Sequence, residues 1–211
     1  MRSLLSILAM TVVLATSLTA APATASATAA DVNGDIRVAM SVVPGYWTQH
    51  WRELSTRAVR HPQVYYFRQG GSLVCDRQRV TISAFYCPGQ HYIGYNWDVL
   101  ARGHAQAPPS VYLILAHEWG HAVQAMAGLR SGAPELQADC LAAVALYGAA
   151  RDGRLRFNQA NVNQMAQVLT QYADRTPWTS ARSHGSAAQR ISAFTRGANS
   201  VQRGYGVRGC L

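Results

Sequence analysis

Hydrophobic and polar positions follow a strand-like pattern in one stretch of the chain. Three short segments, at 64–67, 80–86 and 91–95, are rich in aromatic and β-branched residues, and glycine and proline residues separate them. Short segments of this composition between turn-forming residues are typical of β-strands. We therefore expect a small antiparallel sheet here.

Elsewhere the apolar residues recur at helical spacing. Residues 35–58 show this spacing, but Pro44 and the glycine after it interrupt the pattern, so two short helices are expected. The most apolar segment outside the N-terminal region is 111–127. Ser110 is a suitable N-cap for this helix, and Gly128 is a suitable stop.

Three more helices are expected towards the C-terminus. The first covers about 131–151 with Pro134 in its first turn, and the second covers about 160–172. The third is short and runs from Ser186 to a stop at Gly197. The pattern as a whole predicts an α+β fold that is mostly helical, with the small antiparallel sheet packed on helix 111–127.

The N-terminal thirty residues have the features of a secretory signal peptide. Arg2 provides a positive charge, residues 4–18 are almost wholly apolar, and Ala-x-Ala steps follow between residues 23 and 27. An apolar run of about fifteen residues is shorter than the roughly 20 needed to span a bilayer, so a retained anchor is the less favoured alternative. We expect residues 1–30 to be removed on export, leaving one domain at 31–211.

The four cysteines all follow this N-terminal region. Cys75, Cys87, Cys140 and Cys210 form an even set, and none has C-x-x-C spacing. An even number of cysteines in an exported chain predicts disulfides rather than a zinc knuckle or a redox pair. A bond between Cys75 and Cys87 closes a short loop and leaves Cys140 to pair with Cys210.

The chain is strongly basic. Its formal net charge is +9, all 19 basic residues are arginine, and loss of Arg2 with the signal peptide lowers the charge to +8. The arginines are scattered, which favours a solvated basic surface, with electrostatic attraction to an anionic cell envelope or an acidic substrate as the alternative. No nucleic-acid-binding signature is present, so nucleic acid is not an expected partner.

A zinc-binding pattern stands within helix 111–127. The segment His117-Glu118-Trp119-Gly120-His121 has the form H-E-x-x-H. Residues four apart share one face of a helix, so both imidazoles reach a single ion, while Glu118 stays free to take a proton from water. Two histidines and a glutamate in an apolar helix are also costly unless a partner satisfies them.

A catalytic zinc needs a third protein ligand and an open position, and the next helix supplies the ligand. Glu135 and Asp139 are one helical turn apart, and the short connection folds their helix back against the first. We expect Glu135 to be the third ligand and Asp139 to hold a ligating histidine through its second ring nitrogen. The alternative for Glu135 is a favourable interaction with the helix dipole.

With these residues in place, the chain resembles the bacterial neutral zinc metallopeptidases, a family with a short zincin-type domain. The resemblance covers about 47–210. The blocks that carry it are 84–88, 116–121 together with Glu-Leu-Gln-Ala-Asp-Cys at 135–140, and 184–190. It implies one Zn²⁺ per chain, with His117, His121 and Glu135 as ligands and Glu118 as the catalytic base. The chain departs from the family at 171–174, where such proteins often carry Gly-Asp-Asp.

The block at 184–190 offers candidates for stabilising an oxyanion. His184 is one and Arg190 is the other, because zinc peptidases commonly place such a residue near the metal. The alternative is that His184 and Ser186 cap the last helix and that Arg190 pairs with a carboxylate. The other histidines are expected at the surface or at strand ends; these are His50, His61, His91 and His104.

These observations together predict a secreted bacterial zinc metallopeptidase that hydrolyses peptide bonds in a peptide or protein substrate. An edge strand at 91–95 is expected to bind the substrate in extended form. One alternative is a catalytically silent metal-binding module of the cell envelope, against which the presence of Glu118 argues. Another is a zinc amidase that acts on peptidoglycan.

Overall fold

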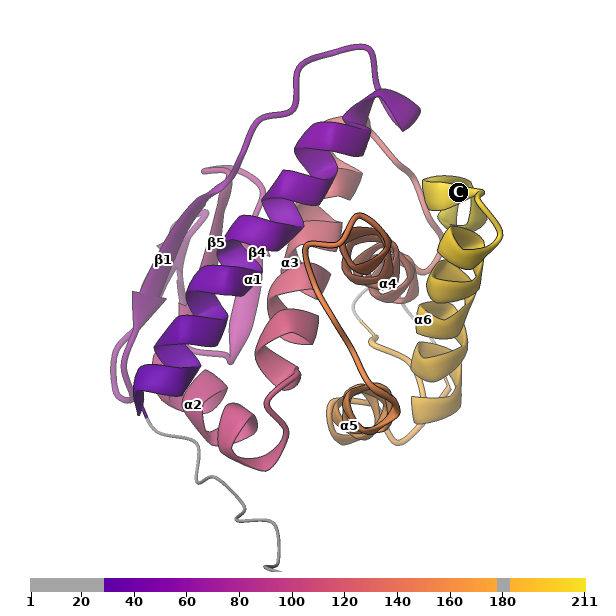
Figure 1. Cartoon of the computed structure of the whole chain (residues 1–211). Coiled ribbons are helices and arrows are strands. Elements are labelled where there is room, and N and C mark those ends of the chain that lie inside the picture. Colours follow the sequence, from indigo (N-terminus) through magenta and orange to yellow (C-terminus); the bar gives the residue numbers. More distant parts are fainter. Residues whose placement is uncertain (1–28, 178–182) are drawn as a thin grey trace, which may run out of the picture.

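The structure is a computed structural model that describes residues 29–177 and 183–211, with side chains from residue 31 onward. The segment 1–28, which makes up most of the predicted signal peptide, lies outside this range. Within it, no helix has the length and apolar character needed to cross a membrane. Figure 1 shows the strands gathered at one side of the molecule, with the helices beside them.

The described residues are mostly helical, as expected. The α-helices are α1 (Ala29–His50), α2 (Trp97–Gln106), α3 (Ser110–Ala127), α4 (Pro134–Arg151), α5 (Gln159–Gln171) and α6 (Ala187–Gln202), and the 3₁₀ helices are η1 (Trp51–Glu53) and η2 (Gly206–Cys210). Helix α2 was not predicted. It begins after Asn96, whose side chain accepts hydrogen bonds from the backbone amides of Asp98 and Val99.

The sheet is mixed rather than antiparallel. Its strands are β1 (Gln63–Phe67), β4 (Ala84–Cys87) and β5 (Tyr92–Asn96), in the order β1-β5-β4; β1 pairs with β5 in parallel and β4 pairs with β5 antiparallel. A separate hairpin joins β2 (Leu73–Cys75) to β3 (Gln78–Val80). The fold is therefore α+β as predicted, but the antiparallel assignment was wrong for β1.

Two details of the strand prediction were also wrong. The segment 80–86 is not one strand, because it is divided between the end of β3 and β4. The segment 91–95 is not an edge strand, because β5 is the central strand and all five of its residues are buried. A central strand has neighbours on both sides, so it has no free edge for a peptide. Strand β4 is an edge strand instead.

Helix α1 is continuous, although Pro44 was expected to divide it. Proline inside a helix costs about 3 kcal/mol because it lacks an amide hydrogen and its ring meets the preceding turn. The helix nevertheless buries Val32, Ile36 and Ala39 against the sheet and α3, and Val43 farther along in the main core. This long apolar stripe offsets the cost of the proline.

Helix α4 is the centre of the core and packs against both α3 and α6 (Figure 1). Glycines permit both close approaches. A Cβ atom on Gly120 would lie 2.8 Å from the carbonyl oxygen of Ala138, and one on Gly197 would collide with the carbonyl of Cys140. The prediction that Gly197 stops the last helix was wrong, because α6 continues to Gln202 and uses this glycine for packing.

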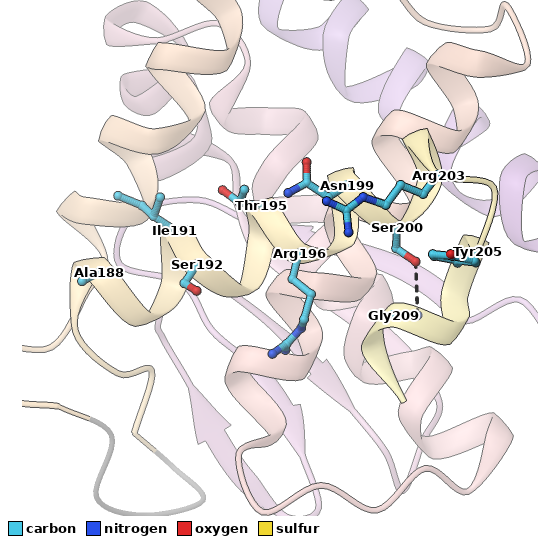
Figure 2. A pocket seen from close by; sticks show the side chains of 10 residues that line it. All are labelled: Ala188, Ile191, Ser192, Thr195, Arg196, Asn199, Ser200, Arg203, Tyr205 and Gly209. Carbon is cyan, nitrogen blue, oxygen red and sulfur yellow. Dashed lines mark hydrogen bonds between the residues drawn. The ribbon is translucent and has the colours of Figure 1, made fainter.

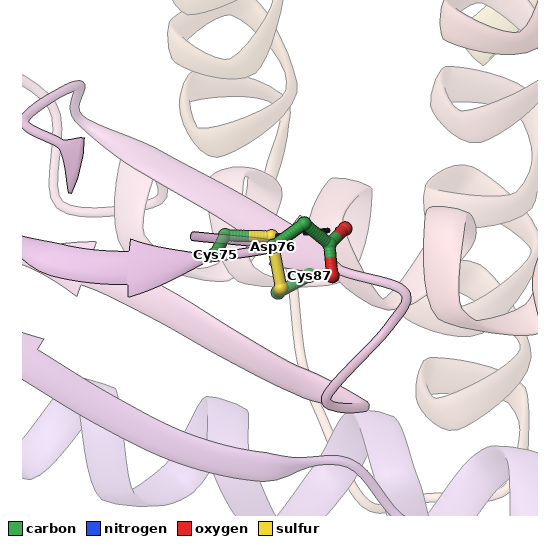
Figure 3. Close-up of side chains that lie close together, drawn as sticks. All are labelled: Cys75, Asp76 and Cys87. Atoms are coloured by element: carbon green, nitrogen blue, oxygen red, sulfur yellow. Dashed lines mark hydrogen bonds between the residues drawn. A yellow bond between two sulfur atoms is a disulfide. The ribbon is translucent and has the colours of Figure 1, made fainter. Parts of the chain in front are cut away.

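The two predicted disulfides are both present. Cys75 and Cys87 are bonded, which joins the hairpin to strand β4 (Figure 3). Cys140 and Cys210 are bonded across a sequence separation of 70 residues, which ties η2 to α4. Disulfides persist in oxidising compartments, so these two bonds fit a protein that functions outside the cytoplasm.

Candidate metal centre

Helix α3 carries the H-E-x-x-H pattern in its buried central part. His117 and His121 lie one turn apart on the same face, and their rings meet edge to face with centroids 4.8 Å apart. The helix ends as predicted at Gly128, whose φ of 66° is left-handed. The chain then turns back towards α3 before α4 begins at Pro134.

This turn brings Glu135, in the first turn of α4, to the two imidazoles. Its Oε2 atom lies 3.2 Å from Nε2 of His117 and 3.4 Å from Nε2 of His121. The structure therefore brings both predicted histidine ligands to Glu135. Among the described residues, however, the side chains here whose ligand atoms all lie within 4.8 Å of one another are His117, Glu135 and His184, a group that does not include His121.

The distance from Glu135 to each of the two imidazoles fits a zinc ion. Zinc binds imidazole nitrogen and carboxylate oxygen at about 2.0–2.2 Å with tetrahedral geometry, so two of its ligand atoms are about 3.4 Å apart. The two distances from Glu135 agree with this value. Two imidazole nitrogens and one carboxylate oxygen are a donor set that zinc prefers, and three such ligands would leave one of four positions for water.

A buried ion pair supports His117 on the side of its ring that faces away from Glu135. Its Nδ1 atom is 2.9 Å from Oδ1 of Asp139, as the sequence predicts for a residue that orients a metal-binding histidine. Arg190 donates to both oxygens of Asp139 at 2.7 and 2.8 Å, and to the carbonyl of Tyr172 at 3.0 Å. Arg190 thus pairs with a carboxylate, the alternative considered for it.

His121 has an equivalent support that the sequence analysis missed. Its Nδ1 atom is 2.9 Å from Oε1 of Gln124. The Gln124 amide in turn donates to the carbonyl of Pro134 and to Oε1 of Gln137. The signal was available, because a glutamine three residues after a helical histidine lies on the same face. Both imidazoles therefore have a fixed orientation, with Nε2 directed towards Glu135.

The charges in this cluster shift one another strongly. Burial alone lowers the pKa of His117, but its hydrogen bonds to Asp139 and Glu135 outweigh burial and raise this pKa to about 10. Burial alone raises the pKa of Glu135, but hydrogen bonds from His117 and His121 hold it far below its usual range. Without a metal the cluster is thus an ion pair, and a cation that binds there must displace a proton from His117.

His184 lies on the loop before α6 and faces the same carboxylate. Its Nε2 atom is 3.5 Å from Oε2 of Glu135, and its Nδ1 atom is 4.0 Å from Oδ1 of Asp174. Its side chain is 46% exposed, so it is far more open to solvent than His117. His184 does not cap α6, because Ser186 is the N-cap. A ring nitrogen of His184 lies within 4.8 Å of ligand atoms of both His117 and Glu135, so this histidine is also a candidate metal ligand, and its role at an oxyanion stays a prediction.

Glu118 lies beside the candidate ligands. Its carboxylate is largely buried, and no hydrogen bond to it is seen within residues 29–177 and 183–211. It lines a hollow of about 540 Å³, here called the metal-site cleft, together with His117, His121 and Glu135. It therefore has the freedom and the location that a base acting on water requires.

Two other features in the described residues are weaker candidates for a site. Cys75, Asp76 and Cys87 also lie close enough to hold an ion, but the two sulfur atoms are joined in a disulfide and are not available as thiolates (Figure 3). A hollow of about 660 Å³ lies along α6 and η2, where Arg196 and Arg203 are exposed at its wall (Figure 2). None of His117, Glu118, His121 and Glu135 lines this hollow.

The remaining histidines are not all at the surface. His104 is only 3% exposed and pairs with Asp35 at 2.8 Å, so its predicted surface position was wrong. Asp35 also accepts a hydrogen bond from Tyr112, so the carboxylate that pairs with the buried imidazole of His104 has a second polar partner. The other three also have partners; His50 contacts Glu53 and Asp152, His61 contacts Thr48, and His91 contacts Tyr86 and the carbonyl of Arg60.

Comparison of the chain with protein-family models, with curated proteins and with solved structures finds no significant match in any of the three.

Proposed function

We propose that this chain is a secreted, zincin-type zinc metallopeptidase that hydrolyses peptide bonds. The observation that carries the proposal is the convergence of two imidazoles and the Glu135 carboxylate at 3.2 and 3.4 Å, with the unbonded Glu118 carboxylate in the same cleft. This is the set of groups that zinc-dependent hydrolysis requires: three ligands, an open position and a base.

A bound Zn²⁺ supplies a Lewis acid for the scissile carbonyl and lowers the pKa of water towards 7. The chain's own residues handle the proton. The Glu118 carboxylate accepts a proton from the attacking water and later delivers it to the departing amine. Asp139 and Gln124 keep the two imidazoles oriented throughout.

Strand β4 is the natural place for the substrate backbone. It pairs with β5 on one side only, and three of its residues, Ala84, Phe85 and Tyr86, line the metal-site cleft. An extended peptide that adds to this edge gains main-chain hydrogen bonds and passes beside Glu118. This assignment replaces the segment 91–95, which is central in the sheet.

His184 is proposed to stabilise the oxyanion. Its position 3.5 Å from the Glu135 oxygen places an N–H donor at the edge of the ligand cluster, on a loop open to solvent. A donor at this point gains strength as negative charge develops on the substrate carbonyl. The excess of arginine over acidic residues further supports association of the protein with an anionic cell envelope.

Replacement of Glu118 by Gln tests the proposal. The substitution keeps the size of the side chain and removes its basic function, so zinc content should stay at one per chain while casein hydrolysis falls at least about a hundredfold. The matched control is Glu53→Gln, which makes the same chemical change at a half-exposed residue that contacts His50. This control should keep full activity.

The measurements are zinc content by atomic emission and the rate of peptide release with and without chelator. Equal hydrolysis by the wild type and Glu118→Gln would disprove the assigned base. A folded protein that takes up no zinc would disprove the metal centre itself.

A further inference from the structure

The positive charge of the chain is concentrated at its C-terminal end. All ten acidic residues lie at or before Asp174, whereas residues 175–211 contain six arginines and no acidic residue. A separation of charge along a sequence indicates a basic surface that meets an anionic partner. This basic segment includes the whole of α6 and η2.

Helix α6 has a buried face and a polar face. Phe194 and Val201 lie in the main core. Residues at intervals of three, four and seven share the opposite face of the helix. The side chains on this face, here called the polar face of α6, are all exposed; they are Ser192, Thr195, Arg196, Asn199 and Arg203.

The polar face of α6 forms one wall of the hollow of about 660 Å³ described above, and η2 lies beside it (Figure 2). The Ser200 hydroxyl fixes η2 there, because it donates to the carbonyl of Gly206 at 2.7 Å and accepts from the amide of Gly209 at 3.2 Å. The bond between Cys210 and Cys140 holds the end of η2. The hollow is therefore a preformed concave surface rather than an open helix face.

The two arginines of the hollow have no partner in the described part of the chain. Neither Arg196 nor Arg203 forms an ion pair or a side-chain hydrogen bond there. By contrast, Arg190 on the same helix pairs with Asp139. Acidic side chains are also absent from the described residues that line the hollow. Its positive charge is therefore available to a ligand.

The donors in the hollow match the chemistry of a chain of phosphates. A guanidinium binds phosphate oxygens through two parallel hydrogen bonds, and Ser, Thr and Asn side chains are common further donors to phosphate. Ser192, Thr195 and Asn199 place such donors next to the two arginines. Arg196 and Arg203 are seven residues apart, which is about 10 Å along a helix axis. Figure 2 shows that their guanidinium groups do not converge on one point, so they suit several linked anions better than one small anion.

Two other anionic partners fit the hollow less well. An acidic peptide that binds in extended form gains its main-chain hydrogen bonds at the edge of a sheet, and the walls of this hollow are helical. A helix that lies on a membrane buries an apolar face in the bilayer, whereas this face of α6 is polar. A flat membrane would also not reach the buried Ser200 that lines the hollow.

We propose that the hollow along α6 and η2 binds an anionic polymer of phosphodiester-linked units, such as a polyol phosphate of the cell envelope. This inference rests on the proposed secretion of the chain and names the partner in its proposed association with the envelope, but it does not require hydrolysis. Arg196 and Arg203 contact separate phosphates of the polymer. Among the described residues, none lines both this hollow and the metal-site cleft, so a bound polymer leaves the cleft open.

The first test is binding of fluorescently labelled poly(glycerol phosphate) to the mature wild type, followed by anisotropy. Arg196→Gln combined with Arg203→Gln should weaken binding at least about tenfold, since charge-assisted hydrogen bonds are lost. The slope of log K against log salt should become less steep by about 1.4, at about 0.7 for each phosphate contact. The matched control is Arg37→Gln combined with Arg79→Gln, which removes the same charge from exposed positions on α1 and β3 and should change affinity less than about threefold.

A second variant tests the hollow without removing an arginine. Asn199→Asp keeps the size of the side chain and places a carboxylate between the two guanidinium groups, where it repels phosphate. Binding of the polymer should again fall at least about tenfold. Asn163→Asp makes the same change at an exposed position of α5 and should leave binding unchanged.

The remaining outcomes identify the ligand and separate this inference from the peptidase. Equal weakening by the two pairs of arginine variants would show a diffuse attraction and overturn the site. Equal binding of polyglutamate would overturn the phosphate chemistry, and binding only to vesicles of phosphatidylglycerol would overturn the polymer. Glu118→Gln should bind the polymer as the wild type does. A protein without hydrolysis therefore leaves this inference in place, and a protein that hydrolyses peptides without binding the polymer refutes it alone.

Discussion

Replacement of Arg190 by Met tests whether the buried pair behind His117 holds the site together. Arg190 is 5% exposed and Asp139 is 0% exposed, and the pair forms two hydrogen bonds. Removing the guanidinium leaves a fully buried carboxylate whose remaining side-chain partner is His117. Breaking a buried pair from one side costs about 3–5 kcal/mol, which is a large part of a typical stability of about 5–15 kcal/mol.

The cost is measured by urea unfolding followed by tryptophan fluorescence, in the presence of chelator so that metal binding does not contribute. The midpoint should fall with no change in slope. Arg196→Met, an exposed arginine on the same helix, is the matched control and should change stability by no more than about 0.5 kcal/mol.

A double-mutant cycle identifies the cause. Asp139→Asn removes the charge that Arg190 neutralises. The free energy of unfolding lost in the double variant should therefore be smaller than the sum of the two single losses by about 1–3 kcal/mol. Strictly additive losses would refute the reasoning, because they would show that the two residues do not stabilise each other. The same variants should bind zinc about 10–100-fold more weakly, since His117 loses its orientation.

Three further outcomes are expected. His184→Ala should lower kcat about a hundredfold and leave zinc affinity unchanged; a matching loss of affinity would make His184 a ligand instead. Replacing Cys140 and Cys210 by Ser should lower the free energy of unfolding by about 4 kcal/mol, because their sequence separation is 70 residues, and an unchanged unfolding midpoint would contradict this. Zinc affinity measured by chelator competition should rise about tenfold per pH unit between pH 6 and 8. The reason is that His117, whose pKa is raised to about 10, must lose a proton before it binds the metal. A flat profile would show that the pKa of His117 is not raised.

The same pKa shift determines how the metal-free protein responds to pH. The pKa of His117 is raised in the folded state, so its protonated form stabilises the fold below its ordinary pKa of 6.5, and this contribution is lost as the pH rises through about 10. The pKa of Glu135 is lowered, so its contribution is present above its ordinary pKa of 4.5 and is lost in strong acid.

Local chemistry explains which parts of the fold the sequence predicts. Gly128 and Pro134 mark the end of one helix and the start of the next, and residues one turn apart share a face, so the placement of His117, His121 and Glu135 follows from short-range rules. The cysteine pairing was also predictable from the sequence. A bond between Cys75 and Cys87 closes a short loop, and only Cys140 and Cys210 then remain to pair.

The failures of prediction concern contacts between distant segments. The parallel pairing of β1 with β5 requires the intervening hairpin and β4 to be placed first, and no local pattern encodes this order. The continuity of α1 through Pro44 depends on the apolar stripe that the sheet, α3 and α4 bury. His104 is buried because Asp35, far away in the sequence, receives it. Each result depends on a partner that the local sequence does not identify.

The support of His121 reaches the last cystine of the protein. Gln124, which orients His121, is itself held by a chain of hydrogen bonds. Its amide donates to Gln137, and the Gln137 amide donates to the carbonyl of Cys210. Cys210 is held in place by its bond to Cys140. A chain that is still reduced therefore lacks a fixed anchor for one imidazole of the proposed metal site, so oxidation of the cysteines should precede tight zinc uptake by the proposed enzyme.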